Sequence, residues 1–141
     1  MSYVNAILRW HIFSCIGSPP ALSLAGLNEL RPLGLKSIAM TSNGIALRRK
    51  LTDLVDHGLT HVNLSLDTLD PITFELITRR RGHEAVLQTL DLALAESRLR
   101  SVKLNVVVIK DLNENEVLDF VELTKDRNLS VRFIEVSVSS A

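Results

Sequence analysis

The chain has 141 residues and no net formal charge, because sixteen lysines and arginines balance sixteen aspartates and glutamates. This length fits one domain with a hydrophobic core. The charge balance leaves no basic excess for nucleic acid or an anionic membrane, so neither is an expected partner. The single cysteine, Cys15, cannot form an internal disulfide or by itself hold a zinc ion or an iron–sulfur cluster.

The first twenty residues contain no acidic residue and include a short apolar stretch, a composition that loosely suggests a targeting segment. They have no basic region before the apolar part, and the apolar run is too short to span a bilayer. An irregular N-terminus is therefore the favoured interpretation.

From residue 36 onward, strand-like and helix-like stretches alternate in the order βαβαβαβ. An earlier helix is predicted over 25–31, ended by Pro32 and Gly34. Strands are predicted over 36–43, 61–67, 102–109 and 130–136. This α/β alternation implies parallel strands joined by right-handed crossovers. The pattern alone leaves open whether they form a doubly wound sheet or a partial (β/α) barrel.

Four helices are predicted between and beside these strands. The first begins at Ile45 and stops at Gly58, which suits a left-handed turn. Asp70 and Pro71 predict the cap and first position of a short helix through Ile77. The next runs over 83–98. The apolar stripes of these first and third helices are predicted to be Leu47, Leu51, Leu54 and Val55, then Val86, Leu87, Leu90 and Leu94.

The last helix is predicted to begin at Asn113, with Glu116 three residues later as a capping-box-like pair. Its predicted apolar face consists of Val117, Phe120 and Val121.

Polar residues at every second position interrupt three of the predicted strands, although a parallel strand covered on both faces is usually apolar throughout. Successive side chains of a strand point to opposite faces, so these residues share one face of the sheet. The predicted polar face comprises Thr41, Asn43, Asn63, Ser65, Asp67, Lys103 and Asn105.

Burying this face dry would cost a few kcal/mol for each unpaired polar group. We therefore expect it to be wet or to bind a polar ligand near the carboxyl ends of the strands, where such folds bind their ligands. The alternative is a solvated open sheet, or a structural network in which Lys103 pairs with Asp67.

Three shorter features carry weaker signals. The sequence TSNG over 41–44 fits a strand-to-helix turn, with Asn43 as a cap and Gly44 relieving strain. The basic run RRRG over 79–82 is interpreted as a solvated loop. His57 and His61 are interpreted as surface residues, because no third ligand at a suitable spacing suggests a metal site.

Taken in order, TSNG, VNLSLDTLDP, RRRG, VKLNVVVIKDLNENEVLDF and VRFIE resemble the GTP 3',8-cyclase family, molybdenum cofactor biosynthesis protein A, from about residue 26 to 135. The resemblance implies a partial (β/α) barrel that holds a [4Fe-4S] cluster and cleaves S-adenosylmethionine (SAM) to a radical that rearranges GTP. A second cluster in the family helps to bind GTP.

By this resemblance, Thr41 and Lys103 match positions that contact GTP, and Ser65 matches one that contacts SAM. The compact ammonium of Lys103 can donate to a phosphate oxygen. The hydroxyl groups of Thr41 and Ser65 can donate to or accept from the nucleotide or SAM. Asn63, Asp67 and Asn105 are expected to support the residues that contact the ligands rather than to contact the ligands themselves.

The sequence departs from the family pattern in three motifs. The CxxxCxxC motif and the C-terminal cluster cysteines are missing, and so is the glycine-rich GGEP stretch. Ser42 stands where the family usually has a second threonine, and Ser137 where it has a SAM-contacting methionine. We therefore expect a divergent segment over 1–25, a partial radical SAM barrel over 26–136 and a divergent tail over 137–141. This division suggests a spliced or truncated product, or a gene-model error.

These observations predict a fragment of a radical SAM lyase that converts GTP to the cyclic pyranopterin precursor, inactive alone because it lacks cluster thiolates. One alternative is a nucleotide-binding or regulatory module that pairs with the full-length cyclase, since half-barrels expose edge strands. Another is a short-lived product without function. The resemblance implies the mitochondrial matrix for a eukaryotic source and the cytoplasm for a bacterial one.

Overall fold

The computed structural model describes residues 11–13, 32 and 35–135. Its strands are β1 (His11–Phe13), β2 (Ala39–Ser42), β3 (His61–Ser65), β4 (Ser101–Val108) and β5 (Leu129–Glu135). Its α-helices are α2 (Leu51–Asp56), α3 (Pro71–Thr78), α4 (His83–Ala95) and α5 (Val117–Glu122), and its 3₁₀ helices are η2 (Leu47–Arg49) and η3 (Glu114–Glu116).

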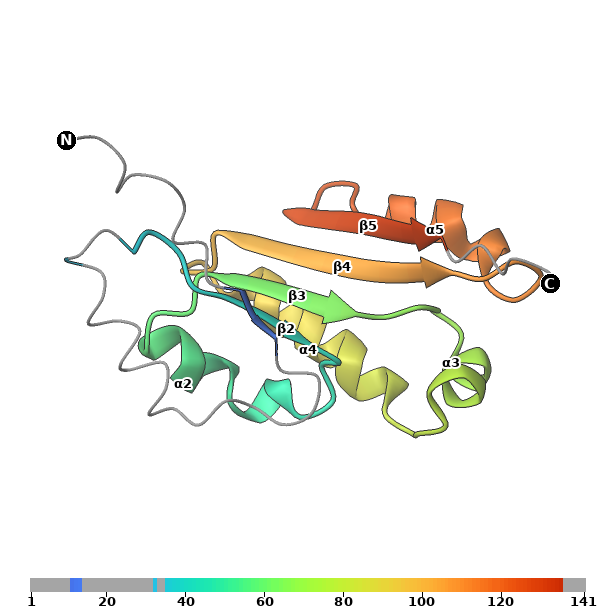
Figure 1. Ribbon diagram of the computed structural model, residues 1–141, viewed down its shortest axis with the longest axis horizontal. Coiled ribbons are helices and arrows are strands. Elements are labelled where there is room, and N and C mark those ends of the chain that lie inside the picture. The colour runs from blue at the N-terminus through green and yellow to red at the C-terminus, as the bar shows by residue number, and fades with distance from the viewer. Residues whose placement is uncertain (1–10, 14–31, 33–34, 136–141) are drawn as a thin grey trace.

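The five strands form one parallel sheet in which chain order and spatial order are the same, β1-β2-β3-β4-β5 (Figure 1). A doubly wound sheet reverses direction at a switch point, and this sheet does not. Every crossover therefore advances in the same direction, as in a (β/α) barrel. The barrel is incomplete, because β1 and β5 lie at opposite edges of the sheet.

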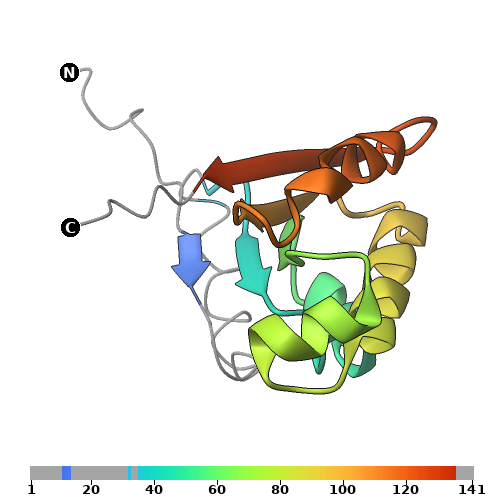
Figure 2. The ribbon, with the colours of Figure 1, turned by 90° about the vertical axis from the view of Figure 1, so that its right-hand side faces the viewer.

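The helices cover one face of the sheet, as the view along the strands shows for α2 and α4 (Figure 2). Strand residues on this face are buried, among them Val62 and Leu64 of β3 and Leu104 of β4. Helix α5 joins the same layer, since Phe120 contacts Phe133 edge to face with ring centroids 6.3 Å apart. The opposite face carries the alternating polar residues of β2, β3 and β4.

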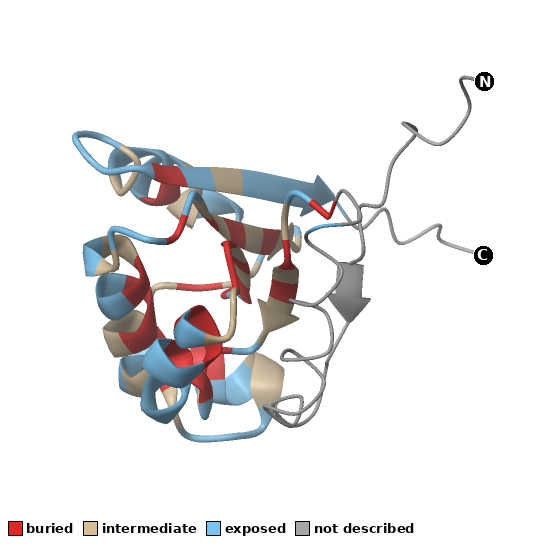
Figure 3. Cartoon of the chain, turned by 90° about the vertical axis from the view of Figure 1, so that its left-hand side faces the viewer, coloured by how far each residue is buried: buried red, intermediate tan, exposed pale blue. Residues whose placement is uncertain are grey.

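The hydrophobic core lies between the sheet and its helices, while β5 is exposed along most of its length (Figure 3). The buried face therefore determines which side of each strand faces the helices, because a shift of one residue would put every core side chain on the polar face.

The predicted helix after Ile45 is in fact two short elements, η2 and α2. The N–H of Lys50 bonds to the carbonyl of Leu47, 2.9 Å away, which closes a 3₁₀ turn before the α-helix begins. The predicted stripe of Leu47, Leu51, Leu54 and Val55 is nonetheless buried. Apolar periodicity identifies the buried side chains, but it does not distinguish bonding to the third residue back from bonding to the fourth.

The next two helices agree with the prediction apart from their ends. Asp70 caps α3 as expected, since its Oδ2 accepts from the N–H of Thr73 at 2.6 Å, and Pro71 is the first helical residue. Helix α4 ends at Ala95 rather than 98, and it buries Val86 and Leu90 fully. Its other two predicted contacts, Leu87 and Leu94, are partly buried against the core.

The predicted capping box of the last helix is wrong. Asn113 makes no cap bond to the following turn, and the segment opens as η3 before α5 begins. Phe120 is buried as predicted, but 49% of Val121 is exposed. The side chains of Asn113 and Glu116 instead bond to neighbouring loops.

Several predictions fall on residues outside the described ranges. These are the helix over 25–31, the segments 1–25 and 137–141 apart from β1, and the roles of Cys15 and Ser137. In the part of the chain that the structure describes, no helix is both long and apolar enough to cross a membrane.

Candidate ligand-binding face

Three of the predicted site residues lie in one row across the sheet. Thr41 on β2 is the register partner of Asn63 on β3, which is the partner of Lys103 on β4, and the row continues to Ser130 on β5. Neighbouring strands lie about 4.8 Å apart, so Thr41 and Lys103 are separated by roughly 10 Å along the row. Register places these residues at one level of the same face, with Asn63 between the two predicted GTP contacts.

A second row lies two residues closer to the carboxyl ends of the strands. Ser65 at the end of β3 pairs in register with Asn105 on β4, and Asn105 pairs with Arg132 on β5. Ser65 and Arg132 are exposed and Asn105 is half-buried. The two rows together bring Thr41, Asn63, Ser65, Lys103, Asn105 and Arg132 onto one surface, which we call the polar face.

Lys103 is half-buried and forms no ion pair with any residue among 35–135. The predicted alternative, in which it pairs with Asp67, is therefore not what the structure contains. A lysine ammonium without a counter-charge among the described residues attracts anions, so this position suits an anionic ligand.

Asp67 lies just beyond β3, and its carboxylate extends the bonding between strands. Its Oδ1 accepts from the N–H of Val107 on β4 at 2.8 Å. Burial raises the pKa of the Asp67 carboxyl above its usual value, and the Val107 hydrogen bond opposes that increase. One of its oxygens is therefore committed to the backbone.

Asn113 and Glu116 join the two loops that follow β3 and β4. Buried Asn113 accepts from the N–H of Ile109 at 2.7 Å and donates through Nδ2 to the carbonyls of Asp67 at 2.6 Å and Val107 at 2.8 Å. Glu116 accepts from the hydroxyl of Thr68 at 2.6 Å. The side chains of Asn113 and Glu116 therefore hold together the loops at the carboxyl edge beside Ser65.

The TSNG turn is fixed to α4 immediately after Thr41. Asn43 is exposed and caps the turn rather than joining the polar face, because its Oδ1 accepts from Ile45 N–H at 3.3 Å. Gly44 has φ +78°, as predicted for a strained position, and its carbonyl accepts from Thr89 at 2.8 Å. A Cβ at Gly44 would lie 3.1 Å from Val86 Cγ1, so the turn also needs the space that glycine leaves.

Of the remaining sequence candidates, His61 begins β3 at the end of the strand opposite Ser65, and the others lie apart from the polar face. Arg79, Arg80 and Arg81 are exposed in the loop before α4, as predicted. The Nδ1 of His57 lies 3.5 Å from Asp53 at the end of α2. Within the described residues, no group of three or more His, Cys, Asp or Glu side chains could hold a metal ion.

Sequence reasoning missed two kinds of residue. Arg132 is the second cation of the polar face, and the alternation of Val131, Arg132 and Phe133 could have revealed it if the polar pattern had been extended to the last strand. Asn113 was predicted to be a helix cap. Its observed bonds to Asp67 and Val107 depend on a contact between loops that sequence spacing does not show.

Residues 10–124 match the family described as the Radical SAM superfamily, so the chain belongs to that superfamily. The consecutive parallel sheet and its open barrel agree with this class. A solved structure of TYW1 with a lysine-pyruvate adduct bound matches with a TM-score of 0.56 at 22% identity, covering 93% of this chain and 43% of that one. At this identity the match supports the fold alone.

Within the superfamily, the chain is similar to GTP 3',8-cyclases. It is 50% identical over 102 residues to the mitochondrial GTP 3',8-cyclase of Arabidopsis thaliana, covering 72% of this chain and 26% of that protein. It is 48% identical over 103 residues to the GTP 3',8-cyclase of Synechococcus elongatus, covering 73% and 31%. Molybdenum cofactor biosynthesis protein moc-5 of Caenorhabditis elegans is 53% identical over 102 residues, covering 72% and 17%. The chain therefore spans less than a third of each of these relatives.

The superfamily implies SAM and an iron–sulfur cluster, and the donor atoms of this chain do not fit the cluster. A cluster that leaves one iron open for SAM needs three thiolates, and these 141 residues contain one cysteine. These residues therefore cannot hold such a cluster by themselves.

Proposed function

We propose that the polar face is the GTP- and SAM-binding surface of a GTP 3',8-cyclase of which this chain is one part. Thr41 and Lys103 contact GTP and Ser65 contacts SAM in this proposal, while Asn63, Asp67 and Asn105 support them. The observation that carries it is the shared register row of Thr41, Asn63 and Lys103 on a face where Lys103 lacks an ion pair among the described residues.

The chemistry of the two rows suits a nucleotide. Lys103 supplies a point charge with three donors for a phosphate oxygen. Arg132 supplies a planar donor group from the second row, on the neighbouring strand β5. Thr41 offers a hydroxyl at the other end of the first row. A ligand with a charged end and a polar end can therefore contact several strands at once.

The relatives' names support a GTP 3',8-cyclase and the process of molybdenum cofactor biosynthesis. The proposed reaction is the conversion of GTP to the cyclic pyranopterin precursor. SAM and [4Fe-4S] clusters supply the radical chemistry in this proposal, and cluster thiolates from outside these residues are required. The chain alone therefore binds nucleotide without turning it over. The mitochondrial name of the plant relative supports a matrix location if the source is eukaryotic.

The test separates binding from catalysis. The purified chain is supplied anaerobically with iron, sulfide, SAM, reductant and GTP, and bound iron, deoxyadenosine and GTP affinity are measured. We expect GTP binding that weakens in Lys103→Gln, with no deoxyadenosine. Absence of GTP binding would reject the proposed face, and deoxyadenosine production would reject the inactivity of the isolated chain.

A second candidate function is a regulatory module that pairs with the full-length cyclase. Residues 132–135 of β5 are exposed, and its outer edge has no strand partner within the described ranges. Ile134 is 43% exposed and Phe133 is 37% exposed on this strand. An exposed apolar edge strand favours pairing with another chain. Co-purification with the full-length cyclase would support this function, and a chain that stays monomeric beside an excess of that partner would count against it.

A further inference from the structure

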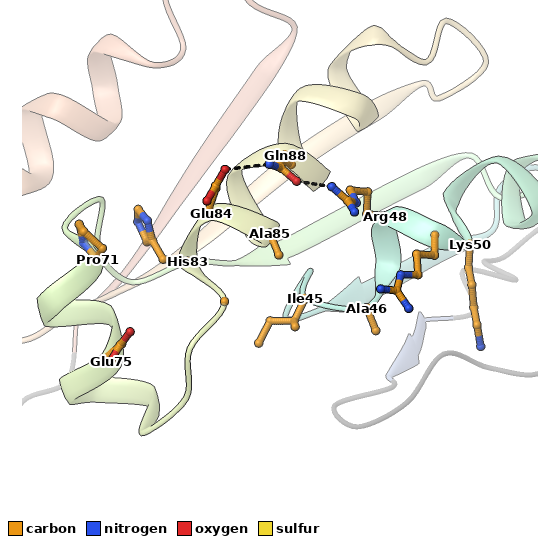
Figure 4. A pocket seen from close by; sticks show the side chains of 12 residues that line it. Ile45, Ala46, Arg48, Lys50, Pro71, Glu75, His83, Glu84, Ala85 and Gln88 are labelled. Carbon is orange, nitrogen blue, oxygen red and sulfur yellow. Dashed lines mark hydrogen bonds between the residues drawn. The ribbon is translucent and has the colours of Figure 1, made fainter.

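A cleft of about 820 Å³ lies between η2, with its flanking residues, and the first turns of α3 and α4. Its lining comes from the 45–50 segment on one side and from Pro71, Glu75 and the 82–88 segment on the other (Figure 4). These elements belong to the helix layer, whereas Lys103 and Thr41 lie on the opposite face of the sheet. The cleft is within the size range of small-molecule sites and is separate from the polar face.

Three consecutive cations, Arg48, Arg49 and Lys50, line the cleft. All three are exposed. Arg48 donates through Nη1 to Gln88 Oε1 on α4, which holds its guanidinium against the opposite side of the cleft (Figure 4). Arg49 and Lys50 form no ion pair with any residue in the described part of the chain. Adjacent cations without a counter-ion repel each other, so this side of the cleft favours an anion.

The two acidic residues of the cleft already have partners. Glu84 accepts a hydrogen bond from Gln88 Nε2 at 3.0 Å, so Arg48, Gln88 and Glu84 form one chain of side-chain contacts. Glu75 lies on α3, with its Oε1 3.8 Å from Arg81 Nε. The lining therefore holds three cations, Arg48, Arg49 and Lys50, and two carboxylates, which leaves one net positive charge on the cation side of the cleft.

The start of α4 adds hydrogen-bond donors to the same cleft. Gly82 is the N-cap of this thirteen-residue helix, and with no side chain it cannot satisfy the first free N–H groups. Glycine is required there, because φ is +138° and a Cβ would lie 3.2 Å from Ile45. His83 follows, lines the cleft and is 92% buried, and its Nε2 has no hydrogen-bond partner in the described residues.

We propose that this cleft, which we call the basic cleft, is a second anion-binding site that takes the phosphate group of a small ligand. Arg49 and Lys50 provide the charge, Arg48 is held in place by Gln88, and the uncapped start of α4 provides backbone donors. Charge-assisted bonds to phosphate are stronger than neutral ones, and the cleft is lined by cations on one side and by the start of α4 on the other.

The test uses inorganic pyrophosphate as the probe and the ¹⁵N-labelled full chain at constant ionic strength of about 0.15 M, where non-specific attraction is screened. We expect the amide signals of 48–50 and 82–85 to move in a saturable titration. Arg49→Gln is expected to weaken that titration by about fivefold or more, since loss of one charge-assisted bond corresponds to roughly a tenfold change.

Two further variants keep the result specific. Arg127→Gln removes one exposed arginine elsewhere and should leave the titration unchanged. Lys103→Gln changes the polar face and should also leave the 82–85 shifts unchanged, so failure of the proposed GTP site is distinguishable from failure of this one. Shifts confined to the polar face, an unsaturable response, or equal weakening by Arg127→Gln would each overturn the basic cleft as a site.

Discussion

Asn63 on β3 donates a hydrogen bond from Nδ2 to the hydroxyl oxygen of Thr41 on β2, with the two atoms 3.3 Å apart. The hydroxyl of Thr41 therefore accepts from inside the sheet and keeps its own hydrogen for a ligand. Asn63 also stands between Thr41 and Lys103 in register, so a change at this position affects both ends of the row.

Replacing Asn63 with aspartate should weaken GTP binding more than replacing it with alanine. Alanine removes the donor to Thr41, whereas aspartate also places a negative charge between Thr41 and Lys103, where it repels phosphate. We expect at least a tenfold loss for Asn63→Asp, or about 1.4 kcal/mol. Calorimetric titration with GTP measures the effect, with circular dichroism to confirm that both variants fold. Equal affinities for Asn63→Asp and the unaltered chain would contradict the role of this row.

Replacing Lys103 with glutamine should lower GTP affinity by about tenfold, because the phosphate loses a charge-assisted bond. The salt dependence of binding should also become shallower, since one fewer cation takes part. Lys125→Gln is the matched control, because it removes an exposed lysine near α5 that pairs with Glu122 at 3.2 Å. If both variants bind GTP equally well across a salt series, Lys103 is not a ligand contact.

Replacing Asn113 with alanine should destabilise the fold by about 3 kcal/mol, because it leaves one partly buried N–H and two partly buried carbonyls without their partner. Urea unfolding measures the change. Asn115→Ala is the control, since Asn115 is exposed in the same segment. An Asn113→Ala chain as stable as Asn115→Ala would show that water replaces these bonds without cost.

Replacing Asp67 with asparagine should stabilise the chain at neutral pH and have little effect in acid. Burial raises the pKa of Asp67 in the folded state. The stability that this shift contributes is therefore present below the unfolded-state pKa near 3.8, and it is lost as pH rises through the folded-state pKa. Asparagine can still accept from Val107 without the cost of a buried charge. Urea midpoints from about pH 3 to pH 7 should diverge as pH increases. A constant difference would contradict this explanation, and Asp111→Asn serves as an exposed control.

Much of the architecture could be predicted because alternation and periodicity report burial directly. Val62 and Leu64 are buried while Asn63 and Ser65 are not, and this two-residue period requires no knowledge of neighbouring strands. The cap of α3 was predictable for the same reason, since Asp70 and Thr73 are close in sequence and their bond is local.

The bonds of Asn113 could not be predicted, because its partners Asp67 and Val107 come from two other parts of the chain. The capping-box pattern was a valid local alternative, and the tertiary contact replaces it by satisfying three partly buried backbone groups at once. Arg132 is an intermediate case, since its alternation with Val131 and Phe133 indicates its face, whereas its place beside Asn105 follows from the register between β4 and β5.

The faces of the strands, the buried stripes of the helices and the residue types on the polar face could be predicted, because these depend on spacing within one segment. The folded chain was needed to establish that the strands run in consecutive order, that Thr41, Asn63 and Lys103 share a row, and that Asp67 bonds to Val107 rather than Lys103. Those features depend on contacts between segments far apart in the chain, whose energies are determined only when the strands are packed side by side.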